Sequence, residues 1–265
     1  ILRAVRFEQR FHFRLSAQAE RLIKNALSLR MLDNLSGARL FNEFRHVLEE
    51  REASSCLRRL EGWKLLQMIH PLLRLTPAKD ILIANADEAL AWHRLLYRTP
   101  APRCWVIYLL ALCSEAKYME TAAVLERFSF TERAGKDFLA LREAVRAAAS
   151  RLAALHRQGG LPLSALYDSL RGLAPEGLIF LMAGHQEEEI GRDISLFLTS
   201  LRDARLDISG SDLEAMGFPP GPEFGETLKR VLHARIDRLV GTREEQADMA
   251  RRILLDLRGK PQGAS

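Results

Sequence analysis

Residues 104–114 read CWVIYLLALCS, the longest uncharged apolar run in a chain of 265 residues. A helix that spans a bilayer needs about 20 apolar residues, so this shorter run predicts a helix buried in a protein core. The surrounding sequence is rich in helix formers: it holds 46 leucines and 33 alanines, whereas valine, isoleucine and threonine together number only 26. Sheets require a denser supply of β-branched residues. We therefore predict an all-α protein, and the composition argues against Rossmann folds, barrels and sandwiches.

Helix boundaries are marked along the chain by capping residues and by Gly/Pro clusters. The predicted caps are Ser16, Ser36, Thr76 with Pro77 at the first helical position, and the capping-box pairs Ser211–Glu214 and Thr242–Glu245. Apolar residues follow the helical period without a fixed repeat length, which disfavours a HEAT or TPR array. The chain starts at Ile1 inside the first predicted helix, so we expect a further domain upstream.

Positive charge is concentrated at one end of the chain. The net charge is +5, and residues 1–30 hold seven Lys or Arg but only two acids. The whole surplus therefore lies in this stretch, which indicates a local contact with a polyanion. The cysteines, Cys56, Cys104 and Cys113, lack CxxC spacing and predict neither a disulfide framework nor a zinc site. Together with the missing signal peptide they favour a cytoplasmic protein, and no membrane contact is predicted.

The first candidate site is the basic face of residues 1–10, ILRAVRFEQR. On a helix, Arg3, Arg6 and Arg10 fall within an arc of about 60°. Three guanidiniums on one face suit a phosphate or nucleotide, because each offers a planar fork of donors. A solvated face paired with acids such as Glu8 explains the spacing equally well.

The second candidate is residues 36–50, SGARLFNEFRHVLEE. Arg39 and Glu43 lie four residues apart and can pair along one helix, which is usually a surface feature of small energy. A functional role would require Glu43 to hold a different, neighbouring arginine in place.

The third candidate is the glycine- and proline-rich stretch 217–225, GFPPGPEFG, directly before a predicted basic helix. A Gly-rich turn that leads into a helix exposes backbone N–H groups and a favourable dipole to phosphate. The residues predicted to contact phosphate are Gly217, Gly221, Gly225, Lys229, Arg230 and Arg235. The turn is also similar to that of a helix-hairpin-helix module, and an ordinary rigid connection is the plain alternative.

Signatures of hydrolases and of metal-dependent phosphoryl transfer are absent from the sequence, which has no HExxH, P-loop, GxSxG or Asp-x-Asp pattern. The carboxylates of an Asp-x-Asp pattern are what two Mg2+ ions would require. We therefore predict no catalytic residue and no metal ligand in this chain.

Two segments resemble motifs of bacterial class II tRNA nucleotidyltransferases and poly(A) polymerases. Residues 1–15, ILRAVRFEQRFHFRL, resemble the segment after the catalytic head, with Arg3, Ala4, Arg6 and Phe7 matching the second half of the motif EDxxRxxRAxRF. Residues 36–48 are similar to the next motif, in which Ser36, Arg39 and Glu43 match and Ala38 replaces a common Glu. Residues 208–246 resemble the family's tail, which contacts the tRNA elbow.

This resemblance implies a chain made of neck, body and tail without the α/β nucleotidyltransferase head. The implied divisions are 1–75 for the neck, 76–205 for the helical body and 206–265 for the tail. In such an enzyme Arg3 and Arg6 bind nucleotide, Ser36, Arg39 and Glu43 brace the neck, and the tail residues given above bind RNA. The head would supply Mg2+ and most of the site for ATP or CTP.

The implied function is the addition of A or CCA to tRNA 3′ ends, with tRNA and a nucleoside triphosphate as partners. This chain alone is expected to bind RNA but not to catalyse. Two alternatives stay open at this point: a helix-hairpin-helix module that binds nucleic acids non-specifically, and a helical scaffold for a protein partner. The choice between A-adding, CCA-adding and poly(A)-adding members stays open too, as does the formation of a dimer.

Overall fold

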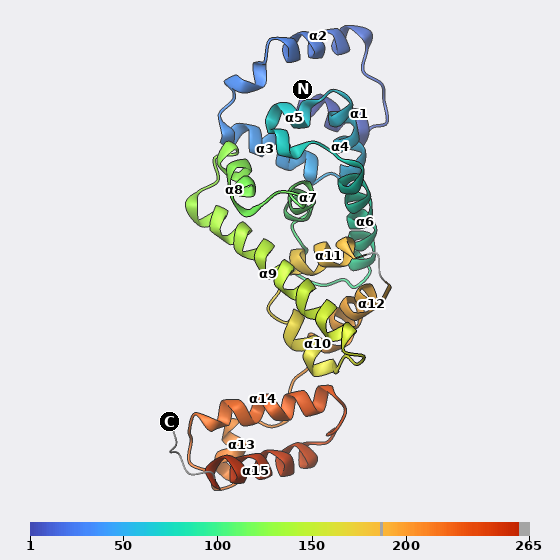
Figure 1. Ribbon diagram of the computed structural model, residues 1–265. Helices are drawn as coiled ribbons and strands as arrows, with labels where there is room; N and C mark the ends of the chain where they lie inside the picture. Colours follow the sequence, from blue (N-terminus) through green and yellow to red (C-terminus); the bar gives the residue numbers. More distant parts are fainter. Residues whose placement is uncertain (186–187, 260–265) are drawn as a thin grey trace. The chain divides into compact units, whose positions relative to one another are not determined.

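The computed structural model describes residues 1–185 and 188–259, and within these ranges the chain forms helices and turns without a strand (Figure 1). The all-α prediction is therefore confirmed. The first helices are α1 (Leu2–Arg10), α2 (Ala17–Ser28), η1 (Met31–Asn34), α3 (Gly37–Leu48), α4 (Ala53–Gly62), α5 (Leu65–Ile69), η2 (Pro71–Leu73), α6 (Pro77–Arg94) and α7 (Cys104–Leu112). They are followed by α8 (Tyr118–Arg127), α9 (Glu132–Arg157), α10 (Leu163–Leu170), α11 (Pro175–Gly184), α12 (Glu188–Leu196), a π-helical segment η3 (Phe197–Leu201), α13 (Gly210–Ala215), α14 (Glu223–Ile236) and α15 (Arg243–Gly259).

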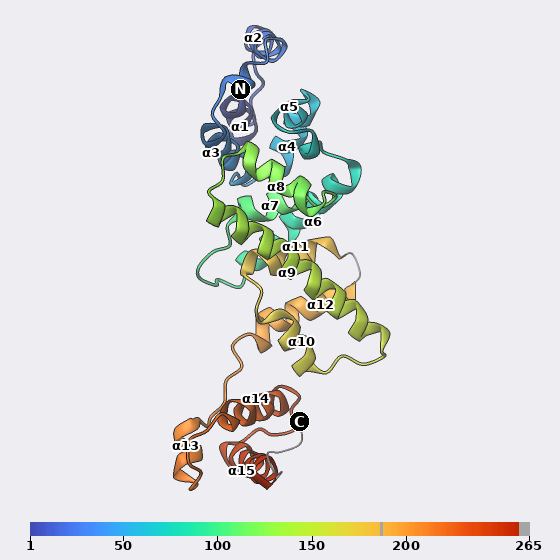
Figure 2. The same ribbon diagram turned by 60° about the vertical axis from the view of Figure 1, so that its left-hand side comes forward.

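The chain divides into two compact units. The first contains residues 1–150 and 173–191, and the second contains residues 151–172 and 192–265. Figure 2 shows the same helices from a second direction. Residues 206–265, the predicted tail, all belong to the second unit. None of the described helices has the length and apolar character needed to cross a membrane.

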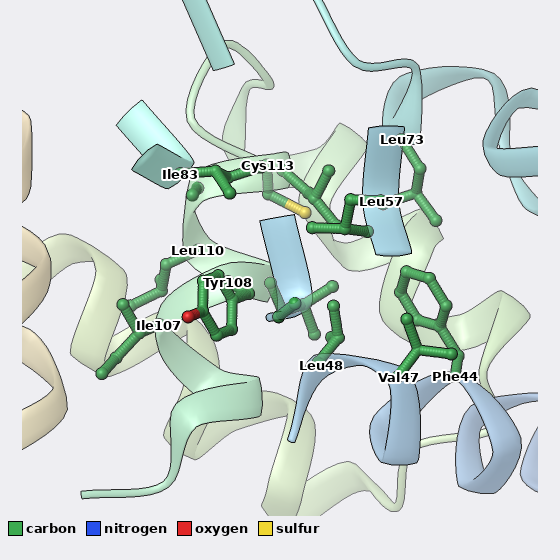
Figure 3. Packing of buried hydrophobic residues seen from close by; sticks show 14 of the residues in the cluster. Phe44, Val47, Leu48, Leu57, Leu73, Ile83, Ile107, Tyr108, Leu110 and Cys113 are labelled. Carbon is green, nitrogen blue, oxygen red and sulfur yellow. The ribbon is translucent and has the colours of Figure 1, made fainter. Parts of the chain in front are cut away.

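Helix α7 lies in the core of the first unit, as the apolar run at residues 104–114 predicts. Every residue from Val106 to Leu112 is buried, and α7 packs against α3, α6 and α11. Figure 3 shows Ile107, Tyr108 and Leu110 in the same buried cluster as Phe44, Leu48 and Ile83. Because α7 is covered on all sides, it needs no polar face, and this explains its uniformly apolar sequence.

Of the five predicted helix caps, three form their hydrogen bonds, Ser36 takes the N-cap position of α3 without a side-chain hydrogen bond, and one is wrong. Ser16 Oγ accepts a hydrogen bond from Ala19 N at 3.1 Å, and Thr76 Oγ1 accepts one from Lys79 N at 3.3 Å. Thr242 and Glu245 form the predicted reciprocal pair at the start of α15, with N···O distances of 3.1 and 3.2 Å.

The capping box of α13 lies two residues before the predicted pair. Ser209, not Ser211, is the N-cap, and its backbone N–H donates to Asp212 Oδ2 at 2.7 Å. The backbone of Ser209 is extended and that of Gly210 is already helical, so Ser209 is the last residue that can cap this helix. Glu214 therefore lies within the helix and takes no part in the capping box.

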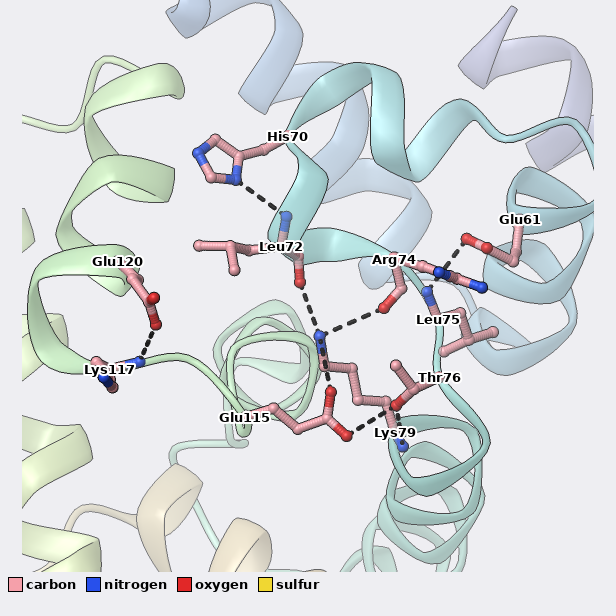
Figure 4. Close-up of polar contacts among 10 residues, drawn as sticks. All are labelled: Glu61, His70, Leu72, Arg74, Leu75, Thr76, Lys79, Glu115, Lys117 and Glu120. Carbon is pink, nitrogen blue, oxygen red and sulfur yellow. Dashed lines mark hydrogen bonds and ion pairs between the residues drawn. The ribbon is translucent and has the colours of Figure 1, made fainter.

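A buried lysine joins the turn before α6 to the end of α7 (Figure 4). Lys79 Nζ donates to the carbonyl oxygens of Leu72 at 2.7 Å and Arg74 at 3.3 Å, and it lies 3.7 Å from Glu115 Oε2. Thr76 Oγ1, beside it, also donates to Glu115 Oε1 at 2.9 Å. Two main-chain carbonyls and one carboxylate thus satisfy an ammonium that would otherwise be costly to bury.

Helix α3 begins against the turn that follows α8. A Cβ atom at Gly37 would overlap Ser129 Oγ and the carbonyl oxygen of Arg127, so only glycine permits this approach. The contact fixes the N-terminal end of α3, the helix that also carries Glu43.

We expect Gly37→Ala to lower the free energy of unfolding of the first unit by about 1–3 kcal/mol, because the extra methyl forces two backbone segments apart. Gly135→Ala is the matched control, since a Cβ at Gly135 in α9 would meet nothing within 4 Å. This control is expected to be neutral or stabilising by up to about 1 kcal/mol. Chemical denaturation followed by circular dichroism measures both, and equal stabilities would refute the close-packing argument.

The predicted tail has its own small apolar core inside the second unit. Its buried members are Ile208, Leu213, Phe224, Val231, Ala250 and Leu254. Gln246 is buried beside them, where its amide donates to Asp207 Oδ2 at 3.0 Å and to the Gly241 carbonyl at 3.2 Å. Helices α14 and α15 pack against each other around this core.

Candidate nucleotide and RNA interface

The arginines of α1 face acids supplied by α3 and the turn after it. Arg3 Nη2 donates to Glu43 Oε1 at 3.0 Å, and Arg10 Nε donates to Glu50 Oε2 at 2.9 Å. Both pairs are separated by 40 residues, so the two segments run in the same direction with a common register. Arg6 Nε also lies 3.3 Å from Glu50 Oε1. The predicted basic face therefore exists, and its geometry depends on carboxylates about 40 residues away.

The three arginines differ in what they can still bind. The Arg3 side chain is 65% exposed despite its ion pair, whereas that of Arg6 is 14% exposed. Arg6 lies against the Phe7 ring, with 5.0 Å between Cζ and the ring centroid. Arg3 is thus held in place but open to a ligand, while Arg6 connects α1 to Glu50.

In the second candidate segment, residues 36–50, the charged side chains pair differently from the Arg39–Glu43 pair that helix spacing suggests. Glu43 binds Arg3 of α1, and no ion pair joins it to Arg39 in the described part of the chain. Arg39 is exposed on α3. Ser36 is the N-cap residue of α3, but its side chain makes no capping hydrogen bond. The structure thus supports the interpretation in which Glu43 positions a neighbouring arginine.

Glu8, which the sequence suggests for a solvated face, is instead a buried carboxylate, and its partner Arg59 connects α1, α2 and α4. Glu8 is buried and accepts hydrogen bonds from Arg59 Nε at 2.8 Å and Nη2 at 3.1 Å. Arg59 Nη2 also donates to Glu20 Oε1 at 3.0 Å, and its Cζ lies 4.3 Å from the Trp63 ring centroid. The hydrogen bond to Glu8 is the main cause that raises the pKa of Arg59. No spacing rule links residues 8 and 59, so only the fold reveals this contact.

The turn before α14 has the predicted glycines, but an internal carboxylate lies where phosphate was expected. Gly217 has a φ of +89°, which strongly favours glycine, and a Cβ at Gly221 would overlap the Glu223 carboxylate. Glu223 is held there by Arg258 Nε at 2.9 Å. A hydrogen bond from its own backbone N–H, followed by Arg258, holds the pKa of Glu223 below its usual range. Gly225 lies on α14, where a Cβ would meet nothing within 4 Å.

The three predicted cations of α14 lie beside carboxylates of the second unit. Lys229 Nζ is 3.9 Å from Asp168 Oδ2, and Arg230 Nε is 2.7 Å from Glu226 Oε1. Arg235 Nη1 is 2.6 Å from Asp207 Oδ2, and this contact is the main cause that lowers the pKa of Asp207. Such partly exposed pairs are weak in water, so a phosphate can compete for the cations.

The described residues offer little for catalysis at a metal. Within 1–185 and 188–259 no group of three His, Cys, Asp or Glu side chains is placed to hold a metal ion. The three cysteines are free thiols, and burial raises the pKa of Cys56 and of Cys113 to about 12. The arginines described above are suited to binding and positioning oxygen-rich ligands.

Comparison with known proteins agrees with the family resemblance of the two ends of the sequence. Residues 12–75 match the family described as the probable RNA and SrmB-binding site of polymerase A. The chain is 37% identical over 256 residues to an A-adding tRNA nucleotidyltransferase of Geobacter sulfurreducens, a match that covers 96% of this chain and 29% of that protein. The chain thus spans less than a third of this relative.

Two solved structures share the fold. A CCA-adding enzyme complexed with ATP is 25% identical, with a TM-score of 0.75 over 97% of this chain and 59% of that one. The Thermotoga maritima CCA-adding enzyme complexed with tRNA is 24% identical, with a TM-score of 0.77 over 97% of this chain and 60% of that one. The family match over residues 12–75, the 37% identity to the Geobacter enzyme and the shared all-helical fold show that the chain is similar to a part of class II tRNA nucleotidyltransferases.

Proposed function

We propose that this chain is the RNA-binding part of an enzyme that adds A to the 3′ end of tRNA, with residues 1–75 as neck, 76–205 as body and 206–265 as tail. The observation that carries this proposal is the ion pair between Glu43 and Arg3, at 3.0 Å. It joins the two motifs that resemble the family and leaves an exposed guanidinium in a defined position. The name of the Geobacter relative favours A over CCA as the added sequence.

On the nucleotide side, Arg3 would contact the triphosphate or base of the incoming nucleotide. Its guanidinium offers several donors in one plane, which suits oxygen-rich ligands. Arg6 and Arg10 share Glu50 and keep α1 in register with α3. ATP or CTP would bind between this helix and a nucleotidyltransferase domain, which would also hold the Mg2+ ions.

On the RNA side, Lys229, Arg230 and Arg235 would contact phosphates of tRNA. Duplex RNA is recognised mainly by shape and by its backbone, so cations spread along a helix suit it better than a base-reading pocket. Glu223 occupies the position in the Gly/Pro turn where a helix-hairpin-helix module would bind phosphate. This contact makes the non-specific module the weaker alternative.

Fluorescence anisotropy distinguishes these functions. The chain is titrated against intact tRNA, tRNA lacking its elbow loops and duplex DNA over a salt series. Tightest binding to intact tRNA, weakened by removal of the elbow, supports the proposed function. Equal binding to all three would support a non-specific module instead, and binding to none would support a protein scaffold.

Replacing both Lys229 and Arg230 by Ala is expected to weaken tRNA binding and to flatten its salt dependence. The slope of log K against log [salt] should fall by about 0.9–1.8, which corresponds to one or two lost phosphate contacts. Arg58→Ala is the control, because Arg58 is an exposed arginine of α4 that is paired with Asp80 at 2.7 Å. An unchanged slope in the double variant would remove α14 from the RNA interface.

A further inference from the structure

A cavity of about 430 Å³ lies in the first unit, beside the end of α7. Its walls come from α7, from the turn that leads to α8, from α9 and from α11. This volume is within the range of sites for small molecules, about 300–1,000 Å³. None of the residues that line it belongs to α1, to α3 or to the predicted tail. The cavity is therefore separate from the candidate nucleotide and RNA interface.

A buried arginine with unused hydrogen-bond donors lines this cavity. The side chain of Arg142, in α9, is only 6% exposed. It donates to the backbone carbonyl of Ala116 and, through Nη1, to Glu143 Oε1 at 2.6 Å. A guanidinium has five N–H donors, and the other donors of Arg142 have no partner among the described residues. A buried donor without a partner is costly, and an oxyanion in the cavity would accept its hydrogen bond.

Two further cations of the lining, Lys117 and Arg146, are exposed. Neither forms an ion pair with a carboxylate in the described part of the chain. Glu120 accepts the backbone N–H of Lys117 at 2.6 Å (Figure 4), so it caps α8 and does not pair with the ammonium. Arg146 follows Arg142 by four residues on one face of α9. Like charges at this spacing repel each other, and an anion that contacts both would relieve the repulsion.

The acid of the lining is already occupied by other groups. Among the described residues the cavity is lined by one carboxylate, that of Glu115. It accepts a hydrogen bond from Thr76 Oγ1 at 2.9 Å and lies 3.7 Å from Nζ of the buried Lys79 (Figure 4). Lys79 offsets this negative charge, so the cations of the lining are in excess. Charge therefore favours an anion in this cavity.

We propose that the cavity lined by Lys117, Arg142, Arg146, Leu110 and Phe180, here called the α7–α9 pocket, binds a small phosphate ester through its three cations. Leu110 and Phe180 supply an apolar surface for the organic part of such a ligand. Sites for small molecules typically combine apolar walls with a few polar groups that converge on one position. The pocket goes beyond the proposed function, because its ligand is neither the incoming nucleotide nor tRNA.

The burial of Arg142 favours a small ligand over an RNA backbone. Protein covers almost all of this side chain, so a group that contacts it must enter the cavity. Duplex RNA is recognised from outside, by its shape and by contacts across its groove, and its phosphates are fixed to that helix. A single phosphate ester is free to enter, and the planar fork of an arginine matches the geometry of phosphate.

Isothermal titration calorimetry of this chain with two probes, phenyl phosphate and inorganic phosphate, tests the pocket. We expect phenyl phosphate to bind about tenfold more tightly than inorganic phosphate, because its ring buries apolar surface against Leu110 and Phe180. Lys117→Gln/Arg146→Gln should weaken the binding of phenyl phosphate about 10–100-fold, because two charge-assisted hydrogen bonds are lost. Both replaced side chains are exposed, so circular dichroism should show an unchanged fold.

Arg133→Gln/Lys136→Gln is the matched control. It removes the same charge from two exposed positions of α9 that do not line the pocket, and phenyl phosphate should bind as it does to the unaltered chain. Equal weakening in the two double variants would show a general effect of charge and would overturn the pocket. Absence of phenyl phosphate binding to the unaltered chain would overturn it too.

Anisotropy with labelled tRNA distinguishes a small ligand from RNA at this position. The Lys117→Gln/Arg146→Gln variant should bind tRNA with the Kd of the unaltered chain, and phenyl phosphate should not displace tRNA. A higher Kd for tRNA in this variant would assign the two cations to the RNA interface, and the proposal would be wrong.

Discussion

If the proposed function holds, Glu43→Gln is expected, in an enzyme with its nucleotidyltransferase domain, to lower kcat/KM for ATP by about 10²-fold while the Kd for tRNA changes little. The carboxylate of Glu43 holds the exposed Arg3 guanidinium at 3.0 Å. Without it Arg3 samples many rotamers, and misplacement of a binding group by about 1 Å costs a factor of this order. Steady-state kinetics at saturating tRNA, together with anisotropy on the same samples, measures both quantities.

A measurement of protein stability distinguishes a positioning role of Glu43 from a role in folding. An ion pair as exposed as Arg3–Glu43 contributes only about 0–1 kcal/mol, so Glu43→Gln should leave the thermal unfolding of the protein nearly unchanged. Glu49→Gln is the matched control, because Glu49 is an exposed acid at the end of α3 with only distant partners, His46 at 3.8 Å and Arg45 at 3.9 Å. Equal losses of tRNA affinity, stability and nucleotide incorporation would make Glu43 a folding residue only.

Helix α7 shows what the sequence predicts well. The residues of α7 are uniformly apolar, which predicts a buried helix, and the composition of the chain argues against a β-sheet. The burial of α7 therefore follows from local sequence alone. Capping residues such as Ser16 and Thr76 belong to the same class, because the hydrogen bonds that they accept come from residues three positions later. The α13 cap was displaced by two residues because several Ser and acidic residues there satisfy the same spacing rule.

The partners of charged side chains could not be predicted, because they depend on which helices meet. Arg39 and Glu43 have ideal spacing for a pair, yet Glu43 binds Arg3, 40 residues away. The Gly/Pro turn has the composition of a phosphate site, yet Glu223 and Arg258 occupy it, 35 residues apart. In both cases tertiary packing brings two distant charges together, so a long-range ion pair forms in place of the local interaction that the spacing suggests.

Arg59→Ala is expected to have the largest effect on stability, a loss of about 3 kcal/mol in the first unit. The substitution leaves the buried Glu8 carboxylate without its charged partner, and an uncompensated buried charge costs about 3–5 kcal/mol. We take the lower end because Arg59 is itself about one third exposed, at 31%. Since the chain has two units, hydrogen exchange of α1 and α4 amides is a better measure than a single global unfolding transition.

The neighbouring residue provides the control, because Arg58→Ala removes an exposed pair with Asp80 and should cost less than about 1 kcal/mol. Adding Glu8→Gln to Arg59→Ala should recover part of the loss, since the second change removes the stranded charge. Equal protection in the Arg58 and Arg59 variants would show that Glu8 is hydrated and that the network does not stabilise the fold.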